Sequence, residues 1–225
     1  TDFMFLNAQI NGNLTIEDNF AQNATSGYEM FYNVNADGSI VIENNFLTRA
    51  TNASLMFYDA NIKNLTIGDN FMMDATNGSQ MFQLIDISGN FNIGNNFMPK
   101  LSNAGNMFFR VENLPANFSL PAGFGSVATS MDAMFFNDSL SADFVLPAGF
   151  GSAATSMGGM FWGAELNGDI DWSGTDLTAS TASKSDMFNS TTWNGHFILA
   201  QNQGSVDWLI DGTGATAANV KVKGS

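Results

Sequence analysis

The chain has 225 residues, with 21 Asp and Glu against seven Lys and Arg, so its formal net charge is −14. This charge repels polyanions and argues against nucleic acid as a partner. The apolar fraction of 44% is too high for a disordered chain, the lack of cysteine excludes disulfides, and no apolar run approaches the roughly 18 residues of a membrane span.

The dipeptide Met-Phe recurs along the chain at intervals of 26, 26, 25, 26, 27, 26 and 27 residues. A fixed period in this range indicates one supersecondary unit stacked many times, with each copy burying its apolar face against its neighbours. We therefore expect a continuous repeat solenoid over residues 1–201, with about eight coils. The copies begin at Met4, Met30, Met56, Met81, Met107, Met134, Met160 and Met187.

The residue that follows Met-Phe is aromatic in most copies. Packing in the core or at its rim is the commoner role for such rings, and a partly exposed strip that contacts a glycan or a protein is the alternative. Both interpretations stay open from the sequence, and the position is our candidate interaction stripe. Its aromatic members are Tyr32, Tyr58, Phe109, Phe136 and Trp162, and the other copies carry Leu6, Gln83 and Asn189.

A short triplet lies about ten residues after each Met-Phe, with apolar outer positions and a mostly polar middle one. This period of two predicts one short strand with a buried face in each repeat. The varying length between Met-Phe and the triplet predicts an exposed loop there. The triplets are 14–16, 40–42, 65–67, 91–93, 118–120, 144–146, 170–172 and 197–199.

An Asn precedes the Phe that follows the strand in the first four copies, at Asn19, Asn45, Asn70 and Asn96. This row could be a ligand-facing strip, but we expect a buried structural ladder that closes turns between stacked coils, because Asn satisfies turn backbone groups well. Acidic residues near this row raise the possibility of a calcium site. Their spacing matches neither an EF-hand nor a GGxGxDxUx calcium turn, so a solvated acidic edge is favoured. No metal and no cofactor are expected. The acids are Glu17, Asp18, Glu43 and Asp69.

Small residues such as Ala24-Thr25 then lead to the next Met-Phe and predict a short helical or 3₁₀ turn. The whole pattern resembles the bacterial surface-protein repeats of the BspA-like leucine-rich-repeat family, most closely at 120–135 and 146–161 and overall across residues 3–200. The resemblance implies a leucine-rich-repeat-like right-handed solenoid, mainly β, with one short parallel strand per repeat of about 26 residues. It also implies a secreted or cell-surface bacterial protein, often adhesive. Few leucines and no regular LxxLxLxxN motif set this chain apart from ordinary leucine-rich repeats.

The two ends of the array differ in the sequence. Residue 3 already lies in the repeat, so we expect the first coil to be uncapped and to be covered by another domain or by a second copy of the chain. The period fails after Gln201. Residues 202–225 are expected to form an irregular C-terminal cap or docking segment, with Val206–Ile210 and Val220–Val222 as two irregular strands.

No residue pattern indicates catalysis. His196 is the single histidine and has no GxSxG motif beside it, and no pair of carboxylates stands out as suited to glycoside hydrolysis. Asp169, Asp171, Asp207 and Asp211 form a second acidic cluster in the sequence, which supports no more specific interpretation. We therefore expect a non-catalytic extracellular or cell-surface scaffold for adhesion that binds a protein or a glycan. The alternative is a self-assembling subunit of an extracellular fibre, built by end-to-end stacking of copies.

Overall fold

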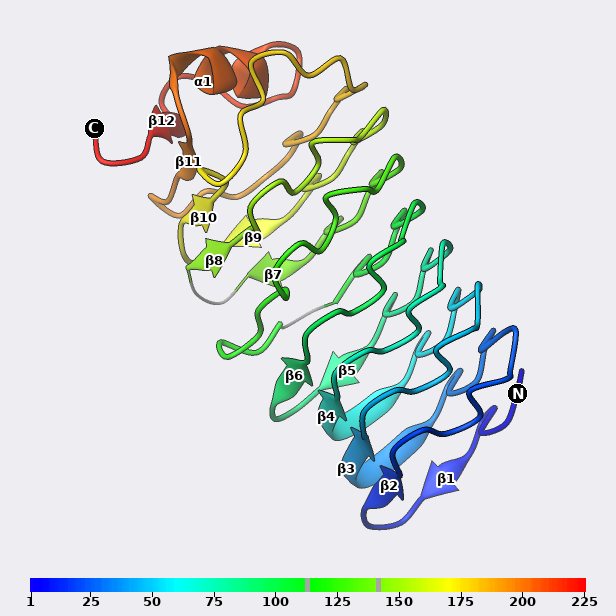
Figure 1. Ribbon diagram of the computed structural model, residues 1–225. Helices are drawn as coiled ribbons and strands as arrows, with labels where there is room; N and C mark the ends of the chain where they lie inside the picture. The colour runs from blue at the N-terminus through cyan, green and yellow to red at the C-terminus, as the bar shows by residue number, and fades with distance from the viewer. Residues whose placement is uncertain (112–113, 141–142) are drawn as a thin grey trace.

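The structure is a computed structural model that describes residues 1–111, 114–140 and 143–225, and it is a parallel β-solenoid (Figure 1). Successive turns of the chain lie one upon another, from β1 at one end to α1 and β12 at the other. Neighbouring turns pair in parallel at the spacing of the repeat, as in Ile40 with Leu65 and Leu65 with Phe91. The expected mainly β repeat solenoid is confirmed.

The strands form two columns that run along the solenoid. The second column contains the predicted triplets, and the first lies just before it in each turn. The first column consists of β1 (Gln9–Ile10), the beginnings of β3 (Asn35–Ile42) and β4 (Asn61–Ile67), then β5 (Asp86–Ile87), β7 (Ser139–Leu140) and β9 (Glu165–Leu166). The second consists of β2 (Leu14–Ile16), the ends of β3 and β4, then β6 (Phe91–Ile93), β8 (Phe144–Val145), β10 (Ile170–Asp171), β11 (Ile198–Ala200) and β12 (Val220–Val222).

The expectation of one strand per repeat therefore accounts for the second column only. The first column occupies the segment that the sequence indicated to be an exposed loop, and its inward residues, such as Ile62 and Leu166, are fully buried. Length variation is absorbed at the corner between the columns, where the β3–β4 register shifts between Ala36 and Ser39. The triplet at 118–120 forms no strand, because the Phe118 N–H donates instead to the Pro115 carbonyl in a local turn.

The short turns expected after the anchoring Phe are present as single hydrogen-bonded turns, and among the described residues none of them extends into a helix. In the second repeat, a single turn is closed by the Ala50 N–H, which donates to the Leu47 carbonyl at 2.9 Å. Leu47 has a φ of 45°, in the left-handed region, so a right-handed helix cannot start there. Each coil then continues to an isolated parallel bridge, as between Asn52 and Asn77, which leads to the next Met-Phe.

The interior consists of columns of identical side chains. The Phe of each Met-Phe stacks on its counterpart in the next coil: Phe31, Phe57 and Phe82 have ring centroids 4.9 and 5.5 Å apart. These spacings follow the roughly 4.8 Å separation of paired strands. A second column of stacked rings contains Phe46 and Phe71, 5.1 Å apart. The Met side chains of the second to eighth Met-Phe are all fully buried, so no coil could bury its core without a neighbour.

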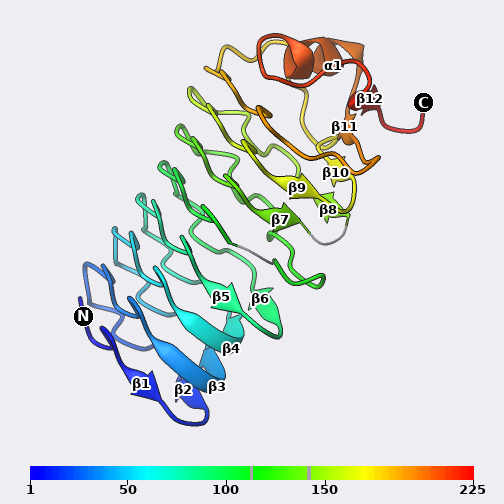
Figure 2. The same ribbon diagram turned by 180° about the vertical axis from the view of Figure 1, so that it is seen from behind.

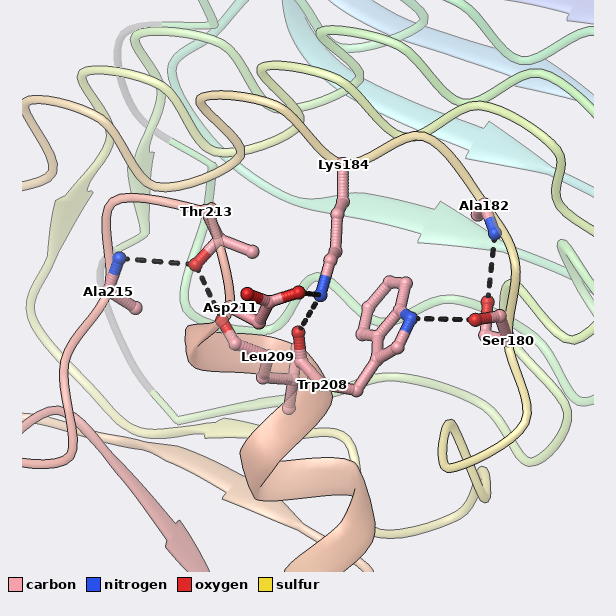
Figure 3. Close-up of polar contacts among 8 residues, drawn as sticks. All are labelled: Ser180, Ala182, Lys184, Trp208, Leu209, Asp211, Thr213 and Ala215. Atoms are coloured by element: carbon pink, nitrogen blue, oxygen red, sulfur yellow. Dashed lines mark hydrogen bonds and ion pairs between the residues drawn. The ribbon is translucent and has the colours of Figure 1, made fainter.

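The C-terminal segment corrects the expectation of two irregular strands. Residues Gln203–Ile210 form α1, which begins at Asn202, where the side-chain oxygen accepts the Ser205 N–H at 2.8 Å. Its buried face includes Trp208, whose indole N–H donates to the Ser180 carbonyl at 2.9 Å (Figure 3). Only Val220–Val222 is a strand, β12, which pairs with β11.

This segment continues the coil in altered form. The Phe188 N–H donates to the Thr213 carbonyl at 2.7 Å, just as the Phe161 N–H donates to the Met187 carbonyl one coil earlier. α1 lies at the end of the stack (Figure 1) and covers the part of the preceding coil that contains Ser180. Residues 202–225 therefore form a final turn in which a helix replaces the extended arm.

The opposite end of the stack lies far from α1 (Figure 2). Phe3, Met4 and Leu6 of the first coil are 49%, 46% and 38% exposed, whereas Met30 in the second coil is completely buried. Among the described residues, no helix is long and apolar enough to cross a membrane.

We predict that Phe57→Ala lowers the free energy of unfolding by about 3–5 kcal/mol, because it removes a fully buried ring that is stacked on both faces. The matched control is Phe5→Ala, which removes a half-buried ring with one stacked neighbour and should cost clearly less. Chemical denaturation followed by circular dichroism measures both variants. Equal losses would show that the stacked column does not stabilise the fold as described.

Candidate interaction surface

The candidate stripe lies along one edge of the solenoid. The Met and Phe that precede each stripe residue point into the core, and the next residue has a left-handed backbone, for example Asn33, with a φ of 51°, after Tyr32. The stripe side chain is therefore placed at the rim, between core and solvent. All five aromatic members are half-buried: Tyr32, Tyr58, Phe109, Phe136 and Trp162.

The stripe consists of two stacked stretches rather than one. Tyr32 and Tyr58 stack with centroids 4.9 Å apart and planes 8° apart. Phe109 and Phe136 stack at 4.7 Å. Gln83 separates the two stretches, and its side-chain carbonyl accepts a hydrogen bond from the Gln80 amide at 2.9 Å. Within a stretch, the ring faces cover one another, so the ring edges are what the stripe mostly presents.

Trp162 ends the second stretch and departs from this regular stacking. Its ring lies 5.8 Å from that of Phe136 but is tilted by 40°. The next coil has Asn189 in the stripe position, so no further ring stacks on the indole. Beside the two rings lies an open cleft of about 290 Å³, whose lining also includes Ala133, Gly159 and Asp186. No sequence pattern predicted this cleft, although its small residues Ala133 and Gly159 stand three positions before the two rings.

The tyrosine stretch is flanked by acidic side chains. Burial chiefly, and then the neighbouring Tyr58 and the carboxylates of Glu29 and Asp59, raises the pKa of Tyr32 above its ordinary value. The Tyr32 hydroxyl therefore remains protonated at neutral pH. It offers a hydrogen-bond donor together with an apolar ring, the combination that suits Tyr to interfaces.

The Asn row forms a hydrogen-bonded ladder. The Asn45 amide donates to the Asn19 carbonyl oxygen at 3.1 Å, and the amides of Asn70 and Asn96 each donate to the preceding rung at 2.9 Å. The ladder is exposed to half-buried, not buried.

Backbone geometry explains the choice of Asn at these positions. All four residues have φ between 55° and 65°, a left-handed conformation that Asn tolerates better than most residues. In the fifth and sixth repeats, Gly123 and Gly149 take the same position with φ of 76° and 79°. The ladder is thus a consequence of a required backbone shape.

Two of the four acids near the Asn row, Asp18 and Asp69, bind the backbone of the next coil. Asp18 accepts the Asn44 N–H at 2.8 Å, and Asp69 accepts the Asn95 N–H at 2.7 Å. Within the described ranges, no three carboxylate or histidine side chains are grouped to hold a metal ion.

The acids near the C-terminus do not come together as one cluster. Asp169 lies 3.3 Å from the His196 Nδ1, and Asp171 pairs with Lys223. Asp207 and Asp211 belong to the helical end of the segment, where Asp211 pairs with Lys184 (Figure 3).

One carboxyl group was missed by the sequence reasoning. Asp138 is 1% exposed and occupies a column that is apolar in the neighbouring coils, at Val111 and Ala164. Its Oδ1 accepts the Val111 N–H at 2.7 Å, and its Oδ2 has no hydrogen-bond partner among the described residues. Burial, only partly offset by the N–H groups of Val111 and Arg110, raises the pKa of Asp138 well above its ordinary range.

We predict that Asn70→Ala lowers the free energy of unfolding by about 1–2 kcal/mol, because Ala is disfavoured in the left-handed region. Asn70→Gly loses the same ladder hydrogen bonds but keeps the backbone shape, so it should cost less. Denaturant titration compares the two variants. A larger loss for the Gly variant would contradict the conformational explanation.

We predict that Asp138→Asn changes how stability depends on pH. The folded pKa of Asp138 lies above its unfolded value, so its contribution is most favourable below the unfolded pKa and is lost as the pH rises towards the folded pKa. The Asn variant lacks this ionisation and should gain stability relative to the parent chain as the pH rises from about 4 to 7. Thermal unfolding across that range measures the difference. If the stability of the parent chain and of the Asn variant depended on pH in the same way, the raised pKa of Asp138 would be refuted.

Comparisons of the chain with known protein families, with curated proteins and with solved structures return no match. The resemblance to the BspA-like family therefore rests on the repeat pattern alone. The architecture is a parallel β-solenoid with an aromatic rim.

Proposed function

We propose that this chain is a non-catalytic binding scaffold of a cell surface or the extracellular space, and that its aromatic stripe contacts a glycan or a protein. The observation that carries the proposal is the alignment of five half-buried rings along one edge of the solenoid. Aromatic side chains are enriched at protein interfaces, because they add large contact area at little cost in conformational entropy.

The fold supports this role by holding the rings rigidly. Each stripe residue follows a Met and a Phe that are fully buried from the second coil onward. The backbone on either side is hydrogen-bonded to the next coil, as in Phe57 to Met81 and Asp59 to Gln83. A surface fixed in this way loses little freedom on binding, which improves affinity without new contacts.

The non-catalytic part of the proposal is supported by the scatter of the ionisable groups. The single histidine, His196, pairs with Asp169 just before β11, and neither residue belongs to the stripe. The Asp169 Oδ1 also accepts the Phe197 N–H at 3.0 Å, so this carboxylate holds the backbone between coils. An extracellular site is supported by the surface composition, which is rich in Asn, Thr and Gly and poor in Lys.

A second candidate is end-to-end association of copies into a fibre. It is favoured by the exposed Phe3, Met4 and Leu6 on the face of the first coil. Stacking this face on the far end of another copy would extend the solenoid head to tail, and such contacts give open filaments unless they close. Light scattering with electron microscopy tests this candidate, and a monomer that persists at high concentration would reject it.

We predict that Tyr58→Ala and Trp162→Ala each weaken binding to the partner by about tenfold or more, because central aromatic residues dominate interface energies. The control is Tyr28→Ala, which removes a half-buried tyrosine outside the stripe. A glycan array and a panel of extracellular matrix proteins identify the partner, and biolayer interferometry ranks the variants. If all three variants bound the partner equally well, the stripe would not be the contact surface.

A further inference from the structure

The cleft beside Trp162 has a composition that no other part of the stripe shares. Phe136 and Trp162 form its aromatic side, and Ala133, Gly158 and Gly159 provide no side chain beyond a methyl group. Ser185 and Asp186 of the next coil complete the lining of the 290 Å³ space. The column beside the two rings contains only the small Ala133 and Gly159 before Asp186, so it leaves the cleft open next to the rings.

Other coils fill the equivalent column with larger side chains. The position before each Met is Glu29, Leu55 and Gln80 in earlier repeats, all with left-handed φ between 51° and 58°. Gly159 has the same backbone shape, with a φ of 60°. A Cβ on Gly159 would come no closer than 3.8 Å to the Trp162 ring, so a side chain fits there and would cover the indole. The cleft thus depends on glycine at one position where the fold accepts a long side chain.

The charge around the cleft is negative. Asp186 is the ionisable member of its lining, and Asp132 accepts the Gly158 N–H at 2.7 Å, which places a second carboxylate at its border. The nearby Lys184 does not offset them, because its ammonium group bonds to the Trp208 carbonyl and lies 3.3 Å from Asp211 (Figure 3). The net charge of −14 adds to this local field and favours cations over anions.

We propose that the cleft binds a quaternary ammonium group, with the cation against the face of Trp162 on which no further ring stacks and with Asp186 as its counter-charge. Aromatic faces attract weakly hydrated cations, and Trp does so most strongly. A lysine ammonium is compact and strongly hydrated, so in an open cleft it keeps its water, whereas a trimethylammonium group does not. The inference rests on the proposed binding role of the stripe and gives its C-terminal end a ligand.

The test compares choline with dimethylbutanol, the alcohol of the same shape in which carbon replaces nitrogen. The indole N–H signals of the four tryptophans in an NMR titration report binding, and Trp162→Ala assigns the responding signal. We expect choline to bind and the uncharged isostere to bind about tenfold more weakly. A trimethyl-lysine peptide in a parallel titration distinguishes a protein-borne ammonium group from a small molecule.

Two further variants separate the charge from the ring. Asp186→Asn should weaken choline several-fold and leave the isostere unchanged. Gly159→Gln keeps Trp162, places in the cleft the side chain that Gln80 has in the fourth repeat, and should block choline. Tyr28→Ala, at a half-buried tyrosine outside the stripe, is the matched control with unchanged choline binding. A thermal melt of each variant checks that it is folded.

Equal affinities for choline and its isostere, or choline binding that survives both Trp162→Ala and Gly159→Gln, would overturn the inference. The failure of choline alone is distinguishable from failure of the proposed function. If a neutral oligosaccharide or a matrix protein binds and Tyr58→Ala weakens it, the stripe remains a binding surface while the ammonium site is rejected.

Discussion

The structure depends on hydrogen bonds from the backbone of each coil to the backbone of the next. The Phe31 N–H donates to the Met56 carbonyl and the Phe57 N–H to the Met81 carbonyl, each at 2.8 Å. Fixing this register places like residues above like, and the stacked rings, the Asn ladder and the stripe all result from it. It also explains why Leu47 and Met72 adopt left-handed backbones that cost about 1–2 kcal/mol each: the surrounding register leaves them no alternative.

The sequence predicts those features that repeat in side-chain type. The Met-Phe spacing, the triplets and the Phe anchors fixed the solenoid and the core, because each recurs with the same chemistry in almost every copy. The first strand column was missed, because its inward residues, such as Ala36 and Ile62, are too few per coil to show a period. The final helix was missed because it occurs once, and its buried Val206, Trp208 and Leu209 are compatible with a strand.

The candidate site was partly predictable for the same reason. The stripe residues were identifiable because each directly follows Met-Phe, and Gln83 at the same position showed where the row of aromatic residues is interrupted. The cleft was not predictable, because it is formed by residues of two neighbouring columns. Neither Gly159 nor Trp162 indicates a cleft by itself, and the space is completed by Asp186 of the next coil. Asp138 was also visible in the sequence, as an acid four residues after the repeat Met where the neighbouring repeats have Val111 and Ala164.

The direction of the coil-to-coil hydrogen bonds has a mechanical consequence. These bonds run along the long axis, and the first and last coils lie at opposite ends (Figure 2). Tension applied between those ends would act on the hydrogen bonds of every coil-to-coil interface in turn, so coils would separate from the end of the stack one at a time. Each peeled coil of about 26 residues would release roughly 90 Å of extended chain at ~3.4 Å per residue. A solenoid built in this way would lengthen in steps under tension and would limit the force that it transmits.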